Sequence, residues 1–162
     1  MELTIVTTMY RSAPYLREFY TRCCTAAEKI TLDFEIILVD DGSPDDSLAL
    51  AVELYELDPR VRVIDLSRNF GHHKAIMTGL AHAQGQTVFL IDCDLELQPE
   101  ILTQFVDRLR SSGADAVYGV QDTRQDPVLD RFFGRLFYVA FNFLSNEQLP
   151  RNLTTARRSP CR

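Results

Sequence analysis

The chain has 162 residues, a length that fits one domain. Hydrophobic residues make up 46% and charged residues 25% of the sequence, which excludes a disordered or collagen-like chain. The formal net charge of -6 argues against a protein that binds nucleic acid through its overall charge.

Apolar runs and segments of helical periodicity alternate along most of the chain. The runs are continuously apolar, as in FEIILV, which is typical of strands buried on both faces of a parallel sheet. Strands are predicted at 3–8, 34–39, 61–66, 87–91 and 116–120, and helices at 15–29, 46–57, 73–83 and 99–110. This order predicts an α/β fold with an open, mostly parallel, Rossmann-like sheet and helices on both faces.

The basic side chains gather towards the C-terminal end. Residues 1–126 carry 21 acidic and 11 basic side chains, whereas residues 127–162 carry 2 acidic and 6 basic ones. Apolar residues recur at helical spacing over 127–145, which predicts an amphipathic helix that lies in a membrane interface, docks on the sheet or contacts another subunit. Residues 146–162 are predicted to form an irregular basic tail. The apolar face of the helix consists of Leu129, Phe132, Phe133, Leu136, Phe137, Phe141 and Leu144.

No segment of the sequence indicates a membrane span or a secretory signal. No stretch reaches the ~20 apolar residues of a spanning helix, and no basic region precedes an apolar run at the N-terminus. The expected location is therefore the cytoplasm, with the inner face of the membrane as the alternative. The cysteines Cys23, Cys24, Cys93 and Cys161 lack zinc-ligand spacing and are interpreted as reduced structural thiols.

Polar side chains follow the first four predicted strands, at the edge where ligands bind in parallel sheets. Asp92 and Asp94 come directly after the fourth strand, and Glu96 keeps the same alternation. Such carboxylates can share Mg²⁺ or Mn²⁺ with the phosphates of a ligand. The alternative is an ordinary Asp-x-Asp surface pattern. His72 and His73 are not interpreted as metal ligands, because adjacent residues of a helix point in different directions.

The other strand ends offer groups that suit a nucleotide. One carboxylate of the Asp40–Asp41 pair can accept hydrogen bonds from a nucleobase or ribose, and Tyr10 can stack on the base. Arg68 and Lys74 can neutralise a diphosphate. The alternatives are a helix-capping turn for the acidic pair and ordinary surface positions for the rest. Neither glycine-rich phosphate-binding motif is present, which argues against dinucleotide dehydrogenases and P-loop NTPases.

Three motifs in a fixed order carry a resemblance to a known family. They are TIVTTMY in the first predicted strand, IILVDDGSPDDS around the end of the second, and LSRNFGHHKAIMTGLAHAQGQTVFLIDCDLELQPE from the third strand end onward. With them the chain resembles family 2 glycosyltransferases of the GT-A fold, and is similar to dolichyl- and polyprenyl-phosphate mannosyl- or glucosyltransferases. The resemblance implies metal-dependent, inverting transfer of a sugar from a nucleoside diphosphate sugar to a polyprenyl phosphate or glycan acceptor.

The resemblance also implies roles for individual residues. Asp92 and Asp94 match the Asp-x-Asp motif that holds a divalent metal and the donor diphosphate, with Glu96 beside the metal. No acidic residue follows Glu147, so no catalytic base is assigned. The residues implied in binding the donor nucleoside are Thr8, Tyr10, Asp40 and Asp41.

Residues 1–126 are accordingly expected to form a donor-binding domain whose acceptor-binding region is cut short. The chain by itself is then an incomplete transferase or, alternatively, a nucleotide-sugar-binding protein without transfer activity. Phosphohydrolases of the haloacid dehalogenase type and response-regulator-like domains are weaker alternatives. Both place their acidic residues after the first strand, and the first strand here ends in Thr7 and Thr8.

Overall fold

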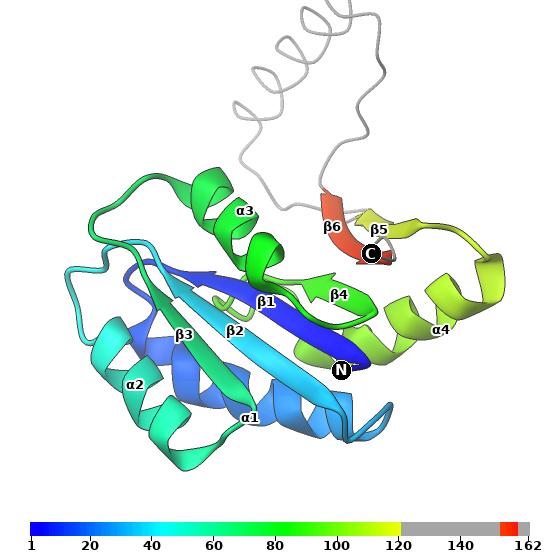
Figure 1. Cartoon of the computed structure of the whole chain (residues 1–162), viewed down its shortest axis with the longest axis horizontal. Helices are drawn as coiled ribbons and strands as arrows, with labels where there is room; N and C mark the ends of the chain where they lie inside the picture. Colours follow the sequence, from blue (N-terminus) through cyan, green and yellow to red (C-terminus); the bar gives the residue numbers. More distant parts are fainter. Residues whose placement is uncertain (121–152, 159–162) are drawn as a thin grey trace, which may run out of the picture. The chain divides into compact units, whose positions relative to one another are not determined.

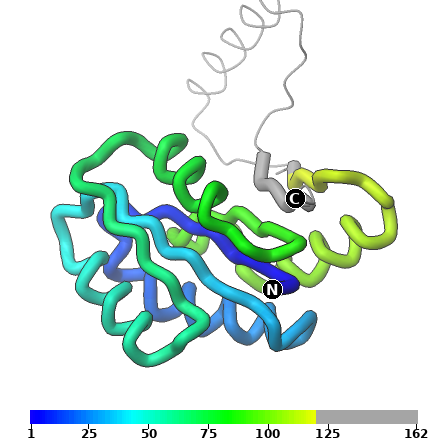
Figure 2. Tube along the Cα trace, in the orientation of Figure 1, coloured from blue at the N-terminus to red at the C-terminus, as the bar shows by residue number. Residues whose placement is uncertain are grey.

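The computed structural model describes residues 1–120 and 153–158. They form an α/β fold on a six-stranded sheet with the strand order β3-β2-β1-β4-β6-β5 (Figure 1). The trace in Figure 2 shows β1 running between β2 and β4, and the predicted parallel sheet is confirmed. The four parallel strands are β1 (Leu3–Met9), β2 (Phe34–Asp40), β3 (Val61–Asp65) and β4 (Thr87–Leu90).

Helices follow the strands in the predicted order. When the short 3₁₀ turn η1 is counted with α4, each boundary up to β5 lies within two residues of its prediction, which is the usual uncertainty of element ends. Pro99 begins η1, since its fixed φ suits the first position of a helical turn. The elements are α1 (Ala13–Glu28), α2 (Ser47–Leu57), α3 (His72–His82), η1 (Pro99–Ile101), α4 (Leu102–Ser112) and β5 (Ala116–Val120).

The strand β6 (Leu153–Arg158) lies within the segment predicted to be an irregular tail, and for these residues that prediction is wrong. β6 pairs antiparallel with β4, with Thr87 opposite Arg158. Its sequence, LTTARR, lacks the apolar pattern of a buried strand. The sequence therefore does not indicate this strand, whose place in the sheet depends on backbone pairing with β4 rather than on composition. The amphipathic helix predicted over 127–145 lies outside the described residues. Of the helices in the described ranges, none has the length and apolarity needed to cross a membrane.

Each face of the sheet carries its own apolar layer, and helices cover both faces (Figure 1). Ile5 and Ile36 lie on the face covered by α1, α2 and α4, and Val6 and Ile37 lie on the face covered by α3, as alternation along a strand requires. Gly79 lets α3 approach closely, because a Cβ there would lie 2.5 Å from Val6 Cγ1. The N-terminal end of α3 is thereby held near the carboxyl edge of the sheet.

The cysteines described by the structure support their interpretation as structural residues. Cys23, Cys24 and Cys93 are buried free thiols. Burial raises the pKa of Cys23 and of Cys93, which keeps both thiols protonated and unreactive. Cys161 lies outside the described residues.

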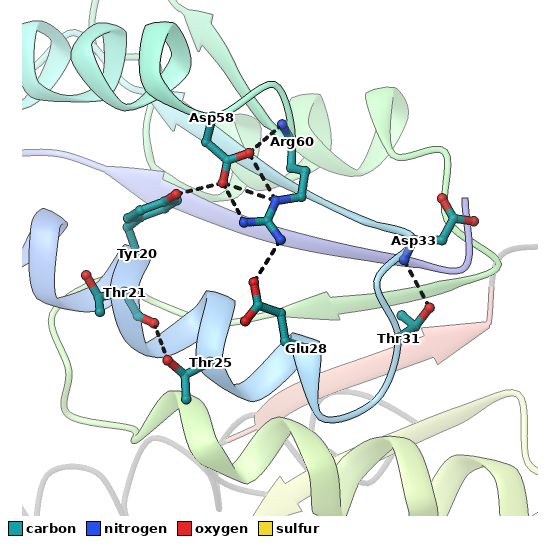
Figure 3. Close-up of polar contacts among 8 residues, drawn as sticks. All are labelled: Tyr20, Thr21, Thr25, Glu28, Thr31, Asp33, Asp58 and Arg60. Atoms are coloured by element: carbon teal, nitrogen blue, oxygen red, sulfur yellow. Dashed lines mark hydrogen bonds and ion pairs between the residues drawn. The ribbon is translucent and has the colours of Figure 1, made fainter.

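A polar cluster ties α1, α2 and the start of β3 together at the amino edge of the sheet (Figure 3). Both oxygens of the buried Asp58 carboxylate accept hydrogen bonds from Arg60, with Arg60 Nη2 at 2.9 Å from Oδ2. The Tyr20 hydroxyl donates to Asp58 at 2.6 Å, and Arg60 also contacts Glu28 at 2.9 Å. These donors, the guanidinium first, lower the pKa of Asp58 to about 2.

Replacing Asp58 with Asn should lower the free energy of unfolding at pH 7 by about 2 kcal/mol. The folded pKa lies below the unfolded value of about 3.9, so this stabilisation is present above pH 4 and is lost as the pH falls towards 2. Urea unfolding between pH 2 and pH 7 measures it. Glu56→Gln, at an exposed carboxylate of α2, is the control; an equal pH profile for wild type and Asp58→Asn would contradict the assignment.

Candidate functional site

The residues predicted to bind a nucleotide and a metal come from four places that meet at the carboxyl edge of the sheet. Parallel strands end on the same side, so the segments after β1, β2 and β4 and the start of α3 lie together there (Figure 1). The predicted residues at this edge are Thr8 and Tyr10 from β1, Asp40 and Asp41 from β2, Arg68 and Lys74 around the start of α3, and Asp92, Asp94 and Glu96 after β4.

Asp92 and Asp94 lie in the turn that follows β4, and both are exposed. The Asp92 side chain is 61% exposed, and its Oδ1 lies 3.7 Å from His72 Nε2. Desolvation at the strand end and the negative charge of Asp94 raise the pKa of Asp92, whereas His72 opposes the shift. Two carboxylates that disfavour each other's charge are stabilised by a bound cation.

The backbone of this turn is strained. Leu95 has a φ of 63°, in the left-handed region that costs about 1–2 kcal/mol for a residue with a side chain. Its side chain packs against the core, and Asp94 Oδ1 accepts a hydrogen bond from the Glu96 backbone N–H at 3.0 Å. Core packing and this bond therefore hold the turn in one shape, and backbone strain of this kind concentrates at functional sites.

The chemistry of these side chains fits a hard divalent cation. Within the described residues, no three His, Cys, Asp or Glu side chains are grouped as ligands for one metal ion, and Glu96 as a third ligand beside Asp92 and Asp94 stays a prediction. Mg²⁺ and Mn²⁺ are commonly held by one or two carboxylates and complete their coordination with water and the phosphates of a ligand. The two aspartates therefore suit a metal that is shared with a phosphorylated ligand.

The acidic pair after β2 is buried, and its two members differ in their contacts. The Asp41 carboxylate accepts backbone N–H bonds from Phe70 at 2.7 Å and Gly71 at 3.0 Å. Asp40 Oδ2 accepts the Ser43 N–H at 2.9 Å, while its buried Oδ1 has no partner among the described residues. Asp41 therefore anchors the segment that leads into α3, and Asp40 Oδ1 is the oxygen of the pair left for a ligand or a water molecule.

Gly42 lies where the segment after β2 meets the segment before α3. Its φ is +67°, and a Cβ there would lie 2.5 Å from the Asn69 nitrogen and 2.6 Å from the Arg68 carbonyl carbon. Any side chain at this position would push Arg68 away from the edge of the sheet. Glycine is thus required both by conformation and by the close backbone approach.

Replacing Gly42 with Ala should lower the free energy of unfolding by about 3 kcal/mol, since steric overlap adds to the left-handed strain. Gly113→Ala is a matched control, because Gly113 has a φ of +66° with nothing within 4 Å of its Cβ position. That variant should lose only about 1 kcal/mol. Chemical denaturation measures both, and equal losses would show that the close approach to residues 68–69 does not matter.

The remaining predicted residues lie at the surface. Tyr10 is exposed, with the Arg11 guanidinium 5.6 Å from its ring centroid. Arg68 and Lys74 are exposed as well, and the Arg68 guanidinium lies 4.8 Å from the Phe70 ring centroid. An exposed ring and two cations at this edge are open to a ligand, and their contacts with a nucleotide stay a prediction.

Sequence reasoning missed His72. Its Nδ1 lies 3.1 Å from Thr8 Oγ1, and its Nε2 lies 3.7 Å from Asp92 Oδ1, so the ring joins the ends of two strands. Neither histidine is predicted to be a metal ligand, and the sequence pattern does not anticipate a contact between one of them and a predicted metal ligand. The available signal was its position at the first residue of a helix that follows a strand end on the predicted ligand-binding edge.

The sequence matches the family described as Glycosyl transferase family 2 over residues 4–161. The chain is 55% identical over 157 residues to a protein of Mycobacterium tuberculosis (strain CDC 1551 / Oshkosh) named among glycosyltransferases, covering 97% of this chain and 46% of that protein. It is 36% identical over 126 residues to undecaprenyl-phosphate 4-deoxy-4-formamido-L-arabinose transferase of Salmonella choleraesuis (strain SC-B67), covering 77% of this chain and 38% of that protein. The chain thus spans less than half the length of these curated relatives.

Solved structures of glycosyltransferases share the fold. The crystal structure of S. aureus TarS in complex with UDP-GlcNAc is 25% identical with a TM-score of 0.61, covering 78% of this chain and 37% of that chain. Mannosyltransferase PcManGT from Pyrobaculum calidifontis, in complex with GDP-Man and Mn²⁺, is 21% identical with a TM-score of 0.67, covering 97% of this chain and 44% of that chain. The predicted GT-A fold class is thereby confirmed. With a family match over nearly its whole length, the chain belongs to glycosyl transferase family 2.

Proposed function

We propose that this chain binds the donor in a metal-dependent glycosyltransferase that moves a sugar from a nucleoside diphosphate sugar to a polyprenyl phosphate or glycan acceptor. One observation carries the proposal. In a member of glycosyl transferase family 2, the exposed carboxylates of Asp92 and Asp94 lie in a strained turn at the carboxyl edge of the sheet, next to polar ends of β1 and β2. This is the edge at which α/β sheets bind nucleotides.

Asp92 and Asp94 are proposed to hold Mg²⁺ or Mn²⁺ together with the donor diphosphate. When bound, the cation stabilises the negative charge that develops on the departing diphosphate. Arg68, in the segment before α3, and Lys74, in the first turn of α3, are both exposed and are proposed to add positive charge near the diphosphate. A similar fold has been solved with GDP-Man and Mn²⁺, which supports a divalent cation with a nucleotide sugar in this site too.

The nucleoside is proposed to lie across the ends of β1 and β2. The exposed Tyr10 ring can stack on the base. Asp40 is proposed to accept a hydrogen bond from the base or ribose; its Oδ1 has no partner in the described part of the chain but is buried, so this contact requires the edge to open as the nucleoside binds. The Thr8 hydroxyl lies at the same edge, 3.1 Å from His72 Nδ1, and is proposed to contact the nucleoside as well.

The acceptor oxygen is proposed to attack the anomeric carbon from the face opposite the departing diphosphate, which inverts its configuration. A phosphate acceptor is already anionic and needs no general base, whereas a sugar hydroxyl does. Relatives of this chain are named undecaprenyl-phosphate transferases. These names support a polyprenyl phosphate as the proposed acceptor.

A polyprenyl phosphate would also set where the protein works. Nucleotide sugars are water-soluble and a polyprenyl chain is buried in lipid, so the reaction takes place where cytoplasm and membrane meet. We therefore place the protein in the cytoplasm, at the inner face of the membrane. The amphipathic helix predicted over 127–145 would supply peripheral contact with lipid. The other partner predicted for this helix is a second subunit.

Calorimetric titration of the whole chain with UDP-glucose and GDP-mannose, with and without Mn²⁺, tests the proposal. Metal-dependent binding of one donor is expected, and the preferred donor shows whether the site recognises uracil or guanine. No binding of either nucleotide sugar at millimolar Mn²⁺ would contradict the proposal.

A second candidate is nucleotide-sugar binding without transfer. The observation that favours it is that every residue proposed above to contact the donor or the metal lies within residues 1–120, where no acceptor-binding residue is proposed. Incubation of the bound donor with polyprenyl phosphate and Mn²⁺ separates the two candidates. Formation of a lipid-linked sugar supports transfer, and binding without product or donor hydrolysis supports the second candidate.

A further inference from the structure

We propose that His72 is a positioning residue that holds the Asp92 carboxylate in place at the metal–diphosphate site. The inference rests on the proposed function and adds to it a residue outside the Asp-x-Asp motif. The ring lies between two strand ends, with Nδ1 3.1 Å from Thr8 Oγ1 and Nε2 3.7 Å from Asp92 Oδ1. It therefore joins the end of β1 to the turn after β4.

The hydrogen-bonding capacity of the three groups determines the orientation of the ring. A neutral imidazole has one N–H donor and one acceptor nitrogen. With the Thr8 hydroxyl donating to Nδ1, the ring carries its hydrogen on Nε2, the atom that faces Asp92 Oδ1. The Asp92 carboxylate can only accept, so the tautomer with its hydrogen on Nε2 suits both contacts, with the Thr8 hydroxyl donating to the other nitrogen.

The backbone around His72 is fixed from two directions. Asp41 accepts the N–H groups of Phe70 and Gly71, the two residues before it. At the other end of α3, Gly79 packs against Val6 of β1. The backbone of His72, the first residue of α3, is therefore anchored to β2 and β1. This fixes the position from which its half-exposed ring extends.

Asp92 gains from such a support. Its side chain is 61% exposed, and the like charge of Asp94 lies nearby. Repulsion from Asp94 leaves the exposed Asp92 carboxylate without a preferred orientation in the absence of a cation, and a donor held in a fixed place beside it favours one orientation. Residues that support a metal ligand in this way are commonly worth 10–100-fold in metal affinity.

His73 provides a matched control. It is exposed, follows His72 directly, and makes no polar side-chain contact within the described ranges; its ring centroid lies 5.7 Å from that of His72. Removing either imidazole changes composition equally. Only removal of His72 takes away the contacts with Thr8 and Asp92.

The experiment is a titration of the whole chain with Mn²⁺ in the presence of UDP or GDP, followed by electron paramagnetic resonance of free Mn²⁺. His72→Ala should raise the Mn²⁺ dissociation constant about tenfold, and His73→Ala should leave it unchanged. His72→Gln keeps an N–H donor on a side chain of similar reach and should recover part of the loss. Thr8→Val should weaken Mn²⁺ binding in the wild type and add little in the His72→Ala background, because both act through one contact chain.

Each contrary result is distinguishable. Equal Mn²⁺ affinities of His72→Ala and His73→Ala would overturn the inference while leaving the proposed function standing. A nitrogen coupling in the pulsed spectrum of bound Mn²⁺ that disappears in His72→Ala would make His72 a direct ligand, and would overturn the positioning role. Absence of Mn²⁺ binding by the wild type would overturn the proposed function and this inference with it. Urea unfolding of all variants checks that each is folded.

Discussion

Replacing Asp94 with Ala is expected to abolish the metal dependence of donor binding. Asp92, Asp94 and Glu96 are the exposed carboxylates that follow β4, and replacing Asp94 removes one of the two ligands proposed above. Groups that merely support a metal ligand cost 10–100-fold when removed, so losing a ligand itself should weaken Mn²⁺-dependent binding more than about a hundredfold. Calorimetry with the preferred nucleotide sugar measures the loss.

The control for Asp94→Ala is Asp107→Ala, which removes an exposed carboxylate from α4. It should bind donor and Mn²⁺ as the wild type does. Asp94→Ala leaves the hydrogen bond between its Oδ1 and the Glu96 N–H unmade, so a small loss of stability accompanies the loss of metal. Unchanged Mn²⁺-dependent donor binding in Asp94→Ala would remove the Asp-x-Asp assignment.

Replacing Glu35 with Ala is expected to cause the largest loss of stability, about 3–5 kcal/mol. The Glu35 side chain is 2% exposed and pairs with Arg62 at 3.0 Å. Its Oε1 also accepts the Thr4 hydroxyl at 2.7 Å and the Gln84 N–H at 2.8 Å. Removal leaves the buried Thr4 hydroxyl and the part-buried Gln84 N–H without this acceptor, and the Arg62 guanidinium without its counter-charge. Against a total stability of about 5–15 kcal/mol, this approaches unfolding.

Two comparisons isolate the cause of that loss. Glu35→Gln keeps an oxygen for Thr4 and Gln84 and loses only the charge, so it should lose less than Glu35→Ala. Glu53→Ala breaks an ion pair with Arg17 in which both side chains are exposed, and should cost less than about 1 kcal/mol. Urea unfolding of the three variants gives the order, and a similar loss for Glu53→Ala and Glu35→Ala would show that burial does not matter.

The contacts of Glu35 also show which features of this molecule cannot be predicted from local sequence patterns. FEIILV is correctly predicted as a buried strand, and its second residue is a glutamate. Nothing in the run itself indicates that Glu35 meets Arg62 from β3 and Gln84 from the segment before β4. Those partners are 27 and 49 residues away along the chain, and only the register of the sheet brings them together.

The carboxyl edge of the sheet also shows which features the sequence predicts and which only the structure reveals. The sequence places Asp92 and Asp94 after a buried strand, and the structure finds them exposed in a turn there. It also places Asp40 and Asp41 at the end of β2 without distinguishing between them. The structure distinguishes them, because Asp41 is held by backbone donors and Asp40 keeps one oxygen without a partner in the described region.

By itself, then, the sequence determined the order of strands and helices, the parallel sheet and the edge where the predicted ligand-binding residues gather. It did so because continuous apolar runs, helical periodicity and turn residues are local signals. Tertiary structure alone decided that β6 pairs with β4, that Asp41 anchors the start of α3, and that His72 lies between Thr8 and Asp92. These are contacts between distant segments, and their formation depends on how the helices and strands pack rather than on any pattern within one of them.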